Sequence, residues 1–265
     1  MLNIVLPIAG RGSRFAEAGF TVPKPLIPIH GTPMIEVVVN NIRPSQPHRF
    51  IFVALQEHLD HLGMRDTLRR IAPDCEIIPV HEVTQGAACT VLLARDLINN
   101  ADPLMLANSD QWVDIDINDY LATMEIRGAD GLIMTMWADH PKWSYVGLDK
   151  AGNIERVVEK QVISNEATVG IYNFARGSDF VCAAEQMIAK NLRVNNEFYV
   201  APAYNEVIET RQKVIYFNVG KEGAGMYGLG VPADLNLFVR NPVSYRAVLN
   251  SRMADMAIRS GGRKV

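Results

Sequence analysis

Short apolar runs alternate with amphipathic segments through the first half of the chain. The runs have the length of buried strands and predict strands at 4–6, 50–55, 77–80 and 103–107. Between them, apolar residues recur at helical spacing and predict helices at 33–41, 57–71 and 86–97, with Pro33 in a first turn. This alternation is typical of a mostly parallel sheet covered by helices.

The second half is richer in strands. The pattern predicts strands at 132–137, 144–148, 154–159, 168–174 and 214–219, with helices at 177–190 and around 203–210. We therefore predict an α/β fold with a mixed, mostly parallel sheet in a single domain, residues 1–240. From Asn241 an amphipathic pattern predicts a closing helix and tail, 241–265, packed on the same domain, with fraying from Ser260. Its apolar positions are Val243, Tyr245, Val248, Leu249, Met253 and Met256.

Composition narrows the class of protein. The hydrophobic content of 48% and the charged content of 21% are ordinary for a globular chain, and the net charge of -3 supplies no basic field for nucleic acid. No apolar run approaches the roughly 20 residues of a membrane span, and no leader pattern opens the chain. Cys75, Cys89 and Cys182 have no metal spacing, and three thiols argue against a disulfide framework. We expect a cytoplasmic protein that binds neither nucleic acid nor membrane.

The first apolar run leads directly into a glycine-rich turn. Gly10 and Gly12 follow Ala9 and allow backbone N–H groups to approach an anion, because no Cβ stands in the way. Arg11, Arg14 and Lys24 bring positive charge to the same neighbourhood. Pro23 and Pro25 are expected to hold the chain extended around Lys24. A strand, a glycine turn and convergent cations predict a polyphosphate site.

The turn contains neither GxxxxGK[ST] nor the third glycine of GxGxxG. Ala9-Gly10-Arg11-Gly12-Ser13-Arg14, followed by Pro23-Lys24-Pro25-Leu26, instead resembles the (A)GxGxR…PKPL signature of the sugar-1-phosphate nucleotidyltransferases. The resemblance extends over about residues 3 to 238. It implies a Rossmann-like, GT-A type fold without an added β-helix domain, and a nucleoside triphosphate bound by residues 9–12 and the strand-end Ser109.

A carboxylate follows the predicted strand 103–107. Open α/β sheets place ligand-binding residues at this end of a strand, and Mg²⁺ prefers one or two carboxylates together with phosphate oxygens. Asp110 is therefore the predicted Mg²⁺ ligand, as it is by resemblance to the family. Asp114 and Asp116 remain alternative ligands, and a helix cap remains an alternative role for Asp110.

Three further segments resemble family elements on the acceptor side. Glu159-Lys160 resembles the V-x-EK element, in which the Glu engages a sugar hydroxyl and the Lys the acceptor phosphate. Gly170 matches a strand glycine that forms a floor under the sugar, and glycine within a strand marks a close approach. Glu197 is a candidate for a hydroxyl contact.

The base contact is predicted at a helix start. Thr84-Gln85-Gly86-Ala87-Ala88 resembles the family's base-reading turn, where free N–H groups and small side chains admit a planar base. Gln85 and His81 are both candidates for the contact that selects the base, and the sequence does not distinguish them.

One position departs from the family pattern. Residues 227–235 resemble W-D-x-G-T-P-x-D-L, but Gly228 stands where many members carry a second metal-binding Asp. Asp234 matches the later Asp and is interpreted as a helix cap. Either one metal suffices, another carboxylate substitutes, or activity is impaired.

By resemblance, the chain joins a nucleoside triphosphate to a sugar 1-phosphate and releases pyrophosphate, with Arg14, Lys24, Asp110 and Lys160 as catalytic residues and Mg²⁺ as cofactor. A homo-oligomer is possible, and polysaccharide precursor synthesis is the expected setting. Three alternatives stay open: a non-sugar acceptor such as phosphocholine, a GT-A glycosyltransferase using Asp114-Ile115-Asp116, and a non-catalytic nucleotide-sugar sensor.

Overall fold

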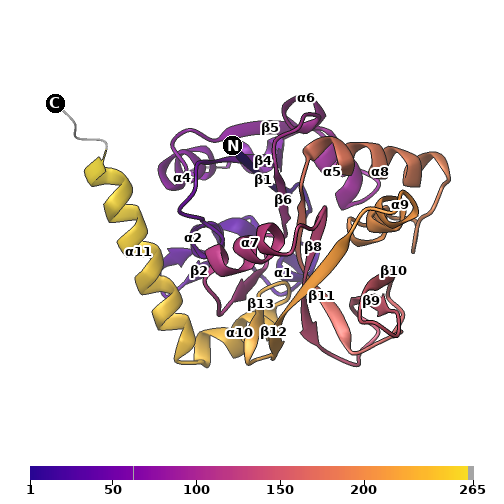
Figure 1. Ribbon diagram of the computed structural model, residues 1–265. Helices are drawn as coiled ribbons and strands as arrows, with labels where there is room; N and C mark the ends of the chain where they lie inside the picture. The colour runs from indigo at the N-terminus through magenta and orange to yellow at the C-terminus, as the bar shows by residue number, and fades with distance from the viewer. Residues whose placement is uncertain (62, 262–265) are drawn as a thin grey trace.

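A single eleven-stranded sheet forms the centre of the computed structural model, which describes residues 1–61 and 63–261. The strand order is β5-β4-β1-β6-β11-β8-β12-β13-β7, and β9 joins β10 and β11 at the side (Figure 1). The strands of this sheet are β1 (Leu2–Ile8), β4 (His48–Leu55), β5 (Glu76–Val80), β6 (Leu104–Ala107), β7 (Gln111–Val113), β8 (Gly131–Trp137), β9 (Ser144–Leu148), β10 (Ile154–Glu159), β11 (Glu166–Phe174), β12 (Val214–Glu222) and β13 (Gly225–Gly228). A separate short hairpin pairs β2 (Pro28–Ile29) with β3 (Thr32–Pro33).

Along the strand order from β5 to β7, five of the eight neighbouring pairs run parallel. β5, β4, β1 and β6 are parallel, β11 is antiparallel to both β6 and β8, and β12 is parallel to β8. This arrangement confirms the predicted mixed, mostly parallel α/β sheet in a single domain. Because β1 and β6 are adjacent and parallel, their carboxyl ends open at the same edge of the sheet.

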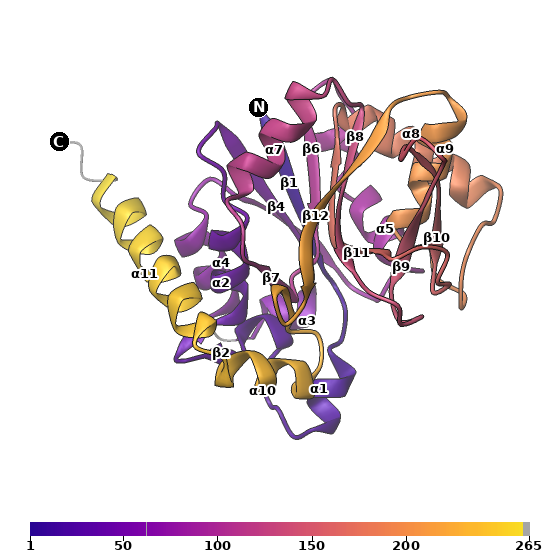
Figure 2. The ribbon, with the colours of Figure 1, turned by 60° about the horizontal axis from the view of Figure 1, so that its bottom comes forward.

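Helices cover both faces of the sheet. The helices are α1 (Ser13–Glu17), α2 (Met34–Asn41), α3 (Gln56–Leu59), α4 (Met64–Ile71), α5 (Ala87–Leu92), α6 (Arg95–Ile98), α7 (Ile117–Ile126), α8 (Gly177–Ala189), α9 (Tyr204–Glu209), α10 (Pro232–Arg240) and α11 (Val243–Gly261), with 3-10 turns η1 (Lys24–Leu26) and η2 (Ala201–Ala203). Figure 1 and Figure 2 show α2, α4 and α11 on one side and α5, α8 and α9 on the other. The core consists of two clusters of buried apolar residues. Within β1, Ile4 and Leu6 belong to one cluster and Val5 to the other, because alternate side chains of a strand point to opposite faces of the sheet.

Two segments that were predicted as single helices each form two shorter helices. The segment 57–71 forms α3 and α4, because Gly63 adopts a φ of 86° before α4 begins. The segment 86–97 forms α5 and α6, separated where Leu93 and Ala94 hydrogen-bond three residues back rather than four. Strand β7, helix α7 and strand β13 are elements that the pattern did not predict, and helix α10 was indicated only by the cap expected at Asp234.

The closing helix is present, but its packing differs from the prediction. Tyr245, Leu249, Met253 and Met256, expected on the buried face, are between 58% and 70% exposed. The buried positions include the apolar Val243, Ala247 and Val248, which belong to the hydrophobic core, and the polar Ser244, Ser251 and Asp255. α11 therefore packs through apolar side chains near its start and through polar contacts to α2 and α4 further along. It runs through Gly261, so Ser260 lies within the helix, and residues 262–265 of the expected frayed tail lie outside the described residues.

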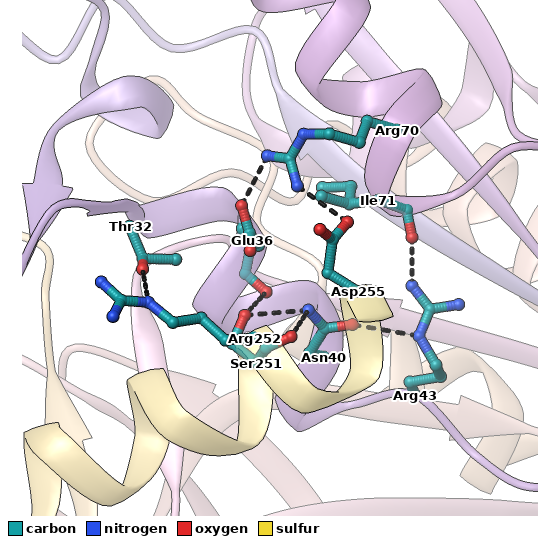
Figure 3. Close-up of polar contacts among 9 residues, drawn as sticks. All are labelled: Thr32, Glu36, Asn40, Arg43, Arg70, Ile71, Ser251, Arg252 and Asp255. Atoms are coloured by element: carbon teal, nitrogen blue, oxygen red, sulfur yellow. Dashed lines mark hydrogen bonds and ion pairs between the residues drawn. The ribbon is translucent and has the colours of Figure 1, made fainter. Parts of the chain in front are cut away.

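Figure 3 shows this polar seam, formed by Glu36 and Asn40 of α2, Arg70 of α4, and Ser251 and Asp255 of α11. The Arg70 guanidinium donates to Glu36 Oε2 at 2.6 Å and to Asp255 Oδ1 at 2.9 Å. Asn40 Nδ2 donates to Ser251 Oγ at 2.9 Å, and Ser251 Oγ donates to the Glu36 carbonyl at 3.2 Å. Each of these polar groups thus has a partner within the seam.

Candidate active site

The loop after β1 depends on Gly12, whose φ is 64°. A Cβ there would lie 3.1 Å from Lys24 Cβ, so a larger residue would meet both conformational strain and a close contact. Gly12 thereby lets Lys24 come close to the end of β1. Pro23 is extended, but the extended stretch predicted around Lys24 is wrong, because the Ile27 N–H donates to the Lys24 carbonyl and closes the turn η1.

Lys24 and Asp110 meet across the site. Lys24 Nζ donates to Asp110 Oδ2 at 2.6 Å, and the two side chains are 18% and 32% exposed. Asp110 lies in the bend after β6, as predicted, and its carbonyl accepts the Leu229 N–H at 2.7 Å. The structure thus brings together residues from the glycine loop, the end of β6 and the segment after β13.

We call the hollow beside these residues the glycine-loop cavity. It has a volume of about 300 Å³, and its lining includes Gly10, Gly12, Ser13, Arg14, Lys24, Asn108, Ser109, Asp110 and Gly230. Ala9 is buried at the end of β1, and Arg11 is exposed beside the loop. In the described part of the chain, the Arg14 guanidinium forms no hydrogen bond or ion pair. Such an uncompensated cation on a cavity wall favours an anionic ligand.

A second hollow, the hairpin cavity, lies between the β9–β10 hairpin, β11 and the start of α10. It also measures about 300 Å³, and its lining includes Lys142, Trp143, Ser144, Glu159, Thr168, Gly170, Tyr172, Tyr199, Gly228 and Asp234. Arg14, Asn108, Asp110 and Gly230 line both cavities. The two cavities therefore share a wall that contains the Asp110 carboxylate.

Glu159 is the most buried acid of the hairpin cavity, with 8% of its surface exposed. The Ser144 hydroxyl donates to its carboxylate. Burial raises the pKa of Glu159, and the bond from Ser144 and the nearby Lys160 oppose that rise. A largely buried carboxylate at a cavity wall suits hydrogen bonds to ligand hydroxyls.

Lys160 lies behind the cavity wall rather than on it. It adopts a left-handed backbone with φ of 55°, and its Nζ donates to Tyr199 Oη at 2.6 Å. This bond raises the pKa of Lys160, and the ammonium also lies 4.7 Å from the Tyr199 ring centroid. Tyr199 itself lines the cavity. Glu197 is exposed and outside the described lining of both cavities, and its charge acts on Lys160 and Tyr199.

Gly170 makes its predicted close approach, but to a side chain. Its φ is 85°, and a Cβ would collide with the side-chain amide of Asn108. The Asn108 N–H donates to the Gly170 carbonyl at 2.9 Å. Gly170 thus seats Asn108 between the two cavities. Sequence analysis missed Asn108, although it directly precedes Ser109 and Asp110 at the strand end.

The predicted base-reading turn packs against the segment that carries Glu197. A Cβ on Gly86 would lie 2.5 Å from the Phe198 backbone, and the Phe198 N–H donates to the Gln85 carbonyl at 2.8 Å. Gln85 and His81 are exposed and do not line the two described cavities. Of this turn, Ala87 lines the hairpin cavity.

Asp234 is not a helix cap. The N-cap of α10 is Val231, and Asp234 lies in the first turn of the helix, on the wall of the hairpin cavity. The alternative metal ligands lie elsewhere: Asp114 pairs with Arg246 at 2.6 Å, and Asp116 accepts the Asn118 N–H as the N-cap of α7. Both line a separate cavity of about 270 Å³.

Sequence analysis also missed Lys142, Trp143, Ser144 and Tyr172, which the β9–β10 hairpin and β11 bring into the hairpin cavity. Only the position of Ser144 and Tyr172 in predicted strands could have indicated them. Within the described residues, no group of three or more His, Cys, Asp and Glu side chains could hold a metal, and no helix has the length and apolarity needed to cross a membrane. A metal here would depend on one or two carboxylates and on ligand oxygens, which is the donor set that Mg²⁺ accepts.

Comparison with known proteins identifies the family. The family model for nucleotidyl transferases matches residues 3–212. Mannose-1-phosphate guanylyltransferase catalytic subunit beta from Danio rerio is 29% identical over 181 residues, 66% of this chain and 50% of that protein. Bifunctional protein GlmU from Burkholderia orbicola (strain MC0-3) is 25% identical and covers 96% of this chain, which corresponds to 54% of GlmU. The chain spans about half the length of these curated relatives.

Solved structures show the same architecture. The nucleoside-diphosphate-sugar pyrophosphorylase from Vibrio cholerae RC9 superposes with a TM-score of 0.76 at 26% identity, covering 91% of this chain and all of that one. A UDP-glucose pyrophosphorylase complexed with UDP-glucose has a TM-score of 0.68 at 17% identity over 98% of this chain, a likeness of fold alone.

Proposed function

The chain belongs to the nucleotidyl transferase family, and we propose that it transfers a nucleotidyl group from a nucleoside triphosphate to a sugar 1-phosphate, giving an NDP-sugar and pyrophosphate. The observation that carries this proposal is the wall shared by the two cavities. Arg14, Asn108 and Asp110 line both, so two ligands bound on either side would meet there. A transfer between two substrates needs such a junction.

The glycine-loop cavity is the proposed triphosphate side. Glycine backbone, the unpaired Arg14 and the nearby Lys24 supply donors and positive charge for phosphate oxygens. As pyrophosphate leaves, negative charge grows on the bridging oxygen, and fixed cations stabilise it without reorganisation. Arg14 and Lys24 are therefore the proposed transition-state residues.

The hairpin cavity is the proposed acceptor side. Glu159 would accept hydrogen bonds from sugar hydroxyls, and Gly170 shapes the floor through Asn108. Tyr199 lines this cavity and holds Lys160 directly behind it, from where the ammonium would align the acceptor phosphate. Glu197 would act on this pair from outside. His81 and Gln85 remain the candidates for the base.

The acceptor phosphate itself is the proposed nucleophile. Its oxygen attacks the α-phosphorus in line, one P–O bond forms, and the bond to pyrophosphate breaks. A phosphate is already ionised at neutral pH, so no general base is needed, and the residues contribute position and charge. When bound, Mg²⁺ would neutralise phosphate charge, and Asp110 is the proposed residue that holds it.

The test is pyrophosphate release in Mg²⁺ buffer, with several nucleoside triphosphates crossed against sugar 1-phosphates and phosphocholine. GTP with mannose 1-phosphate comes first, because a mannose-1-phosphate guanylyltransferase is among the relatives. A productive sugar 1-phosphate pair supports the proposal and identifies base and acceptor. Turnover with phosphocholine alone would replace the sugar acceptor, and triphosphate binding without any turnover would favour a sensor.

We further propose a cytoplasmic setting in polysaccharide precursor synthesis. A glycosyltransferase is disfavoured, since Asp114 and Asp116 are committed to Arg246 and to the start of α7.

A further inference from the structure

The segment after β13 has no side chain at two positions that face carboxylates. A Cβ on Gly230 would lie 2.9 Å from Asp110 Oδ2, and a Cβ on Gly228 would lie 3.3 Å from Asp234 Oδ2. Neither glycine has a φ in the left-handed region, so backbone conformation does not require glycine there. The two glycines therefore leave space beside the two acids, which reach the same short segment from the end of β6 and from the first turn of α10.

The two carboxylates differ in their partners. Both line the hairpin cavity, but Asp110 is paired with Lys24, whereas Asp234 forms no hydrogen bond or ion pair within residues 1–61 and 63–261. Asp234 is partly shielded from solvent in the first turn of α10. A partly buried carboxylate near a second one is unfavourable unless a cation compensates the pair.

We propose that Asp234 is the second carboxylate of the divalent cation site and acts together with Asp110 across Gly228 and Gly230. It would take the place of the strand acid that position 228 lacks, so the loss of that acid is compensated by a residue six positions further along. This inference rests on the proposed function, because it assigns a ligand to the cation of that reaction. It answers the question left open by Gly228 in favour of a substitute carboxylate.

The competing role for Asp234 is structural. An acid in the first turn of a helix stabilises it through the helix dipole by about 0.3–1 kcal/mol. The chain offers a matched control, because Asp119 occupies the third position of α7 as Asp234 does in α10. Asp119 is exposed and lies outside the cavities described here. Asp119→Asn therefore measures the helix contribution without touching the site.

The experiment titrates the full chain with Mn²⁺, alone and with inorganic pyrophosphate, and follows the relaxation rate of water protons. This rate rises when Mn²⁺ is held on a macromolecule and so separates the protein complex from Mn²⁺–pyrophosphate in solution. We expect Asp234→Asn to weaken Mn²⁺ binding about tenfold or more, as Asp110→Asn does, and Asp119→Asn to leave it unchanged. Gly228→Asp combined with Asp234→Asn should restore most of the affinity.

Two results would overturn the inference. If Asp234→Asn binds Mn²⁺ like the unaltered protein while Asp110→Asn does not, Asp234 is not a ligand, and the proposed function stands on Asp110 alone. If Asp119→Asn loses as much affinity as Asp234→Asn, the loss reflects the removal of any acid from the first turn of a helix, and Asp234 is not a ligand. Failure of the unaltered protein to bind Mn²⁺ with pyrophosphate would overturn this inference and the proposed function together.

Discussion

Two clusters of charged side chains in this protein have similar composition but differ in how many of their groups are paired. In the polar seam, Arg70 binds both Glu36 and Asp255, and the neighbouring polar atoms are paired (Figure 3). In and beside the shared wall of the two cavities, Lys24 is paired with Asp110, while Arg14 and Asp234 have no partner among the described residues. A cluster that satisfies itself has no capacity left for a ligand, whereas one with unpaired charges has.

The two clusters also differ in how much they contribute to the free energy of unfolding. The Lys24–Asp110 pair is partly exposed to solvent and contributes about 0–1 kcal/mol to folding. In the seam, Glu36 is 4% and Asp255 9% exposed, so each depends on its cation. We therefore expect substitutions in the cavity wall to impair turnover and substitutions in the seam to impair stability.

The largest expected effect is that of Lys24→Ala on turnover. Removing a fixed cation from the leaving group should lower kcat by about 10²–10³, by analogy with the loss of one oxyanion donor. The unfolding midpoint in urea should hardly change. Steady-state kinetics on the productive substrate pair and urea unfolding measure the two quantities.

The control for Lys24→Ala is Arg95→Ala, which breaks an ion pair with Glu185 whose side chains are about half exposed. This variant should leave both kcat and stability near their original values. A Lys24→Ala protein with full turnover would show that the wall cation has no role in the reaction.

Arg70→Ala should show the reverse behaviour. It removes the cation that Glu36 and Asp255 share, and the expected loss is about 2–3 kcal/mol of unfolding free energy, below the value for a fully buried pair because Arg70 is 31% exposed. The kcat of the folded protein should stay unchanged. Urea unfolding followed by circular dichroism gives the loss, again with Arg95→Ala as the reference. A stable Arg70→Ala protein with reduced kcat would make the two clusters equivalent and break the comparison.

The sequence predicts one cluster better than the other, because the two differ in whether their residues belong to local sequence patterns. Lys24 and Asp110 belong to recognisable local patterns, a glycine loop with its proline-flanked lysine and a carboxylate after a buried strand. In the seam, Arg70 is 34 positions from Glu36 and 185 positions from Asp255 along the chain, and no local sequence pattern indicates such distant pairs. The pattern of α11 was correct only near the start of the helix, where Val243 and Val248 are buried. Helical periodicity identifies an apolar face but not how far the domain covers it.

The sheet was easier to predict than the turns. Buried strands read as continuous apolar runs because parallel strands are covered on both faces, and most of them were predicted within a few residues. The role that we propose for Asp234 could not be inferred from sequence, because it depends on the space that Gly228 leaves and on the direction of α10. Asn108 likewise acquires its place only when Gly170 is seen to accommodate it.

A smaller effect tests the acids outside both clusters. Asp116→Ala removes the N-cap of α7 and should cost about 1 kcal/mol of unfolding free energy with kcat unchanged. Thermal and urea unfolding measure the cost. Asp114→Ala, which breaks only an exposed pair with Arg246, is the matched variant and should cost less. If either substitution lowered kcat strongly, these acids would take part in the reaction and the glycosyltransferase alternative would regain support.

The smallest expected effect is that of Glu159→Gln on stability. Burial of the Glu159 carboxylate at the cavity wall is expected to lower the stability of the folded protein. Because its pKa in the folded protein is raised above the ordinary 4.5, the folded state binds more protons than the unfolded state between these two pKa values, and stability falls as the pH rises through that interval. Glu159→Gln keeps an acceptor for the Ser144 hydroxyl and removes the buried charge. Its unfolding free energy should exceed that of the original protein above the folded pKa, and the gain should vanish below pH 4.5.

Urea unfolding from pH 4 to 7.5 measures this gain, and Glu155→Gln, an exposed acid on the same strand, supplies the reference curve. A gain for Glu159→Gln that stays constant with pH would mean that the carboxylate is not penalised by burial. A gain that grows with pH would mean that the buried charge of Glu159 destabilises the folded protein. Glu36 and Asp255 are also buried, but both are paired with Arg70. The pairing of a buried anion with a protein cation would then be what separates the seam from the cavity wall.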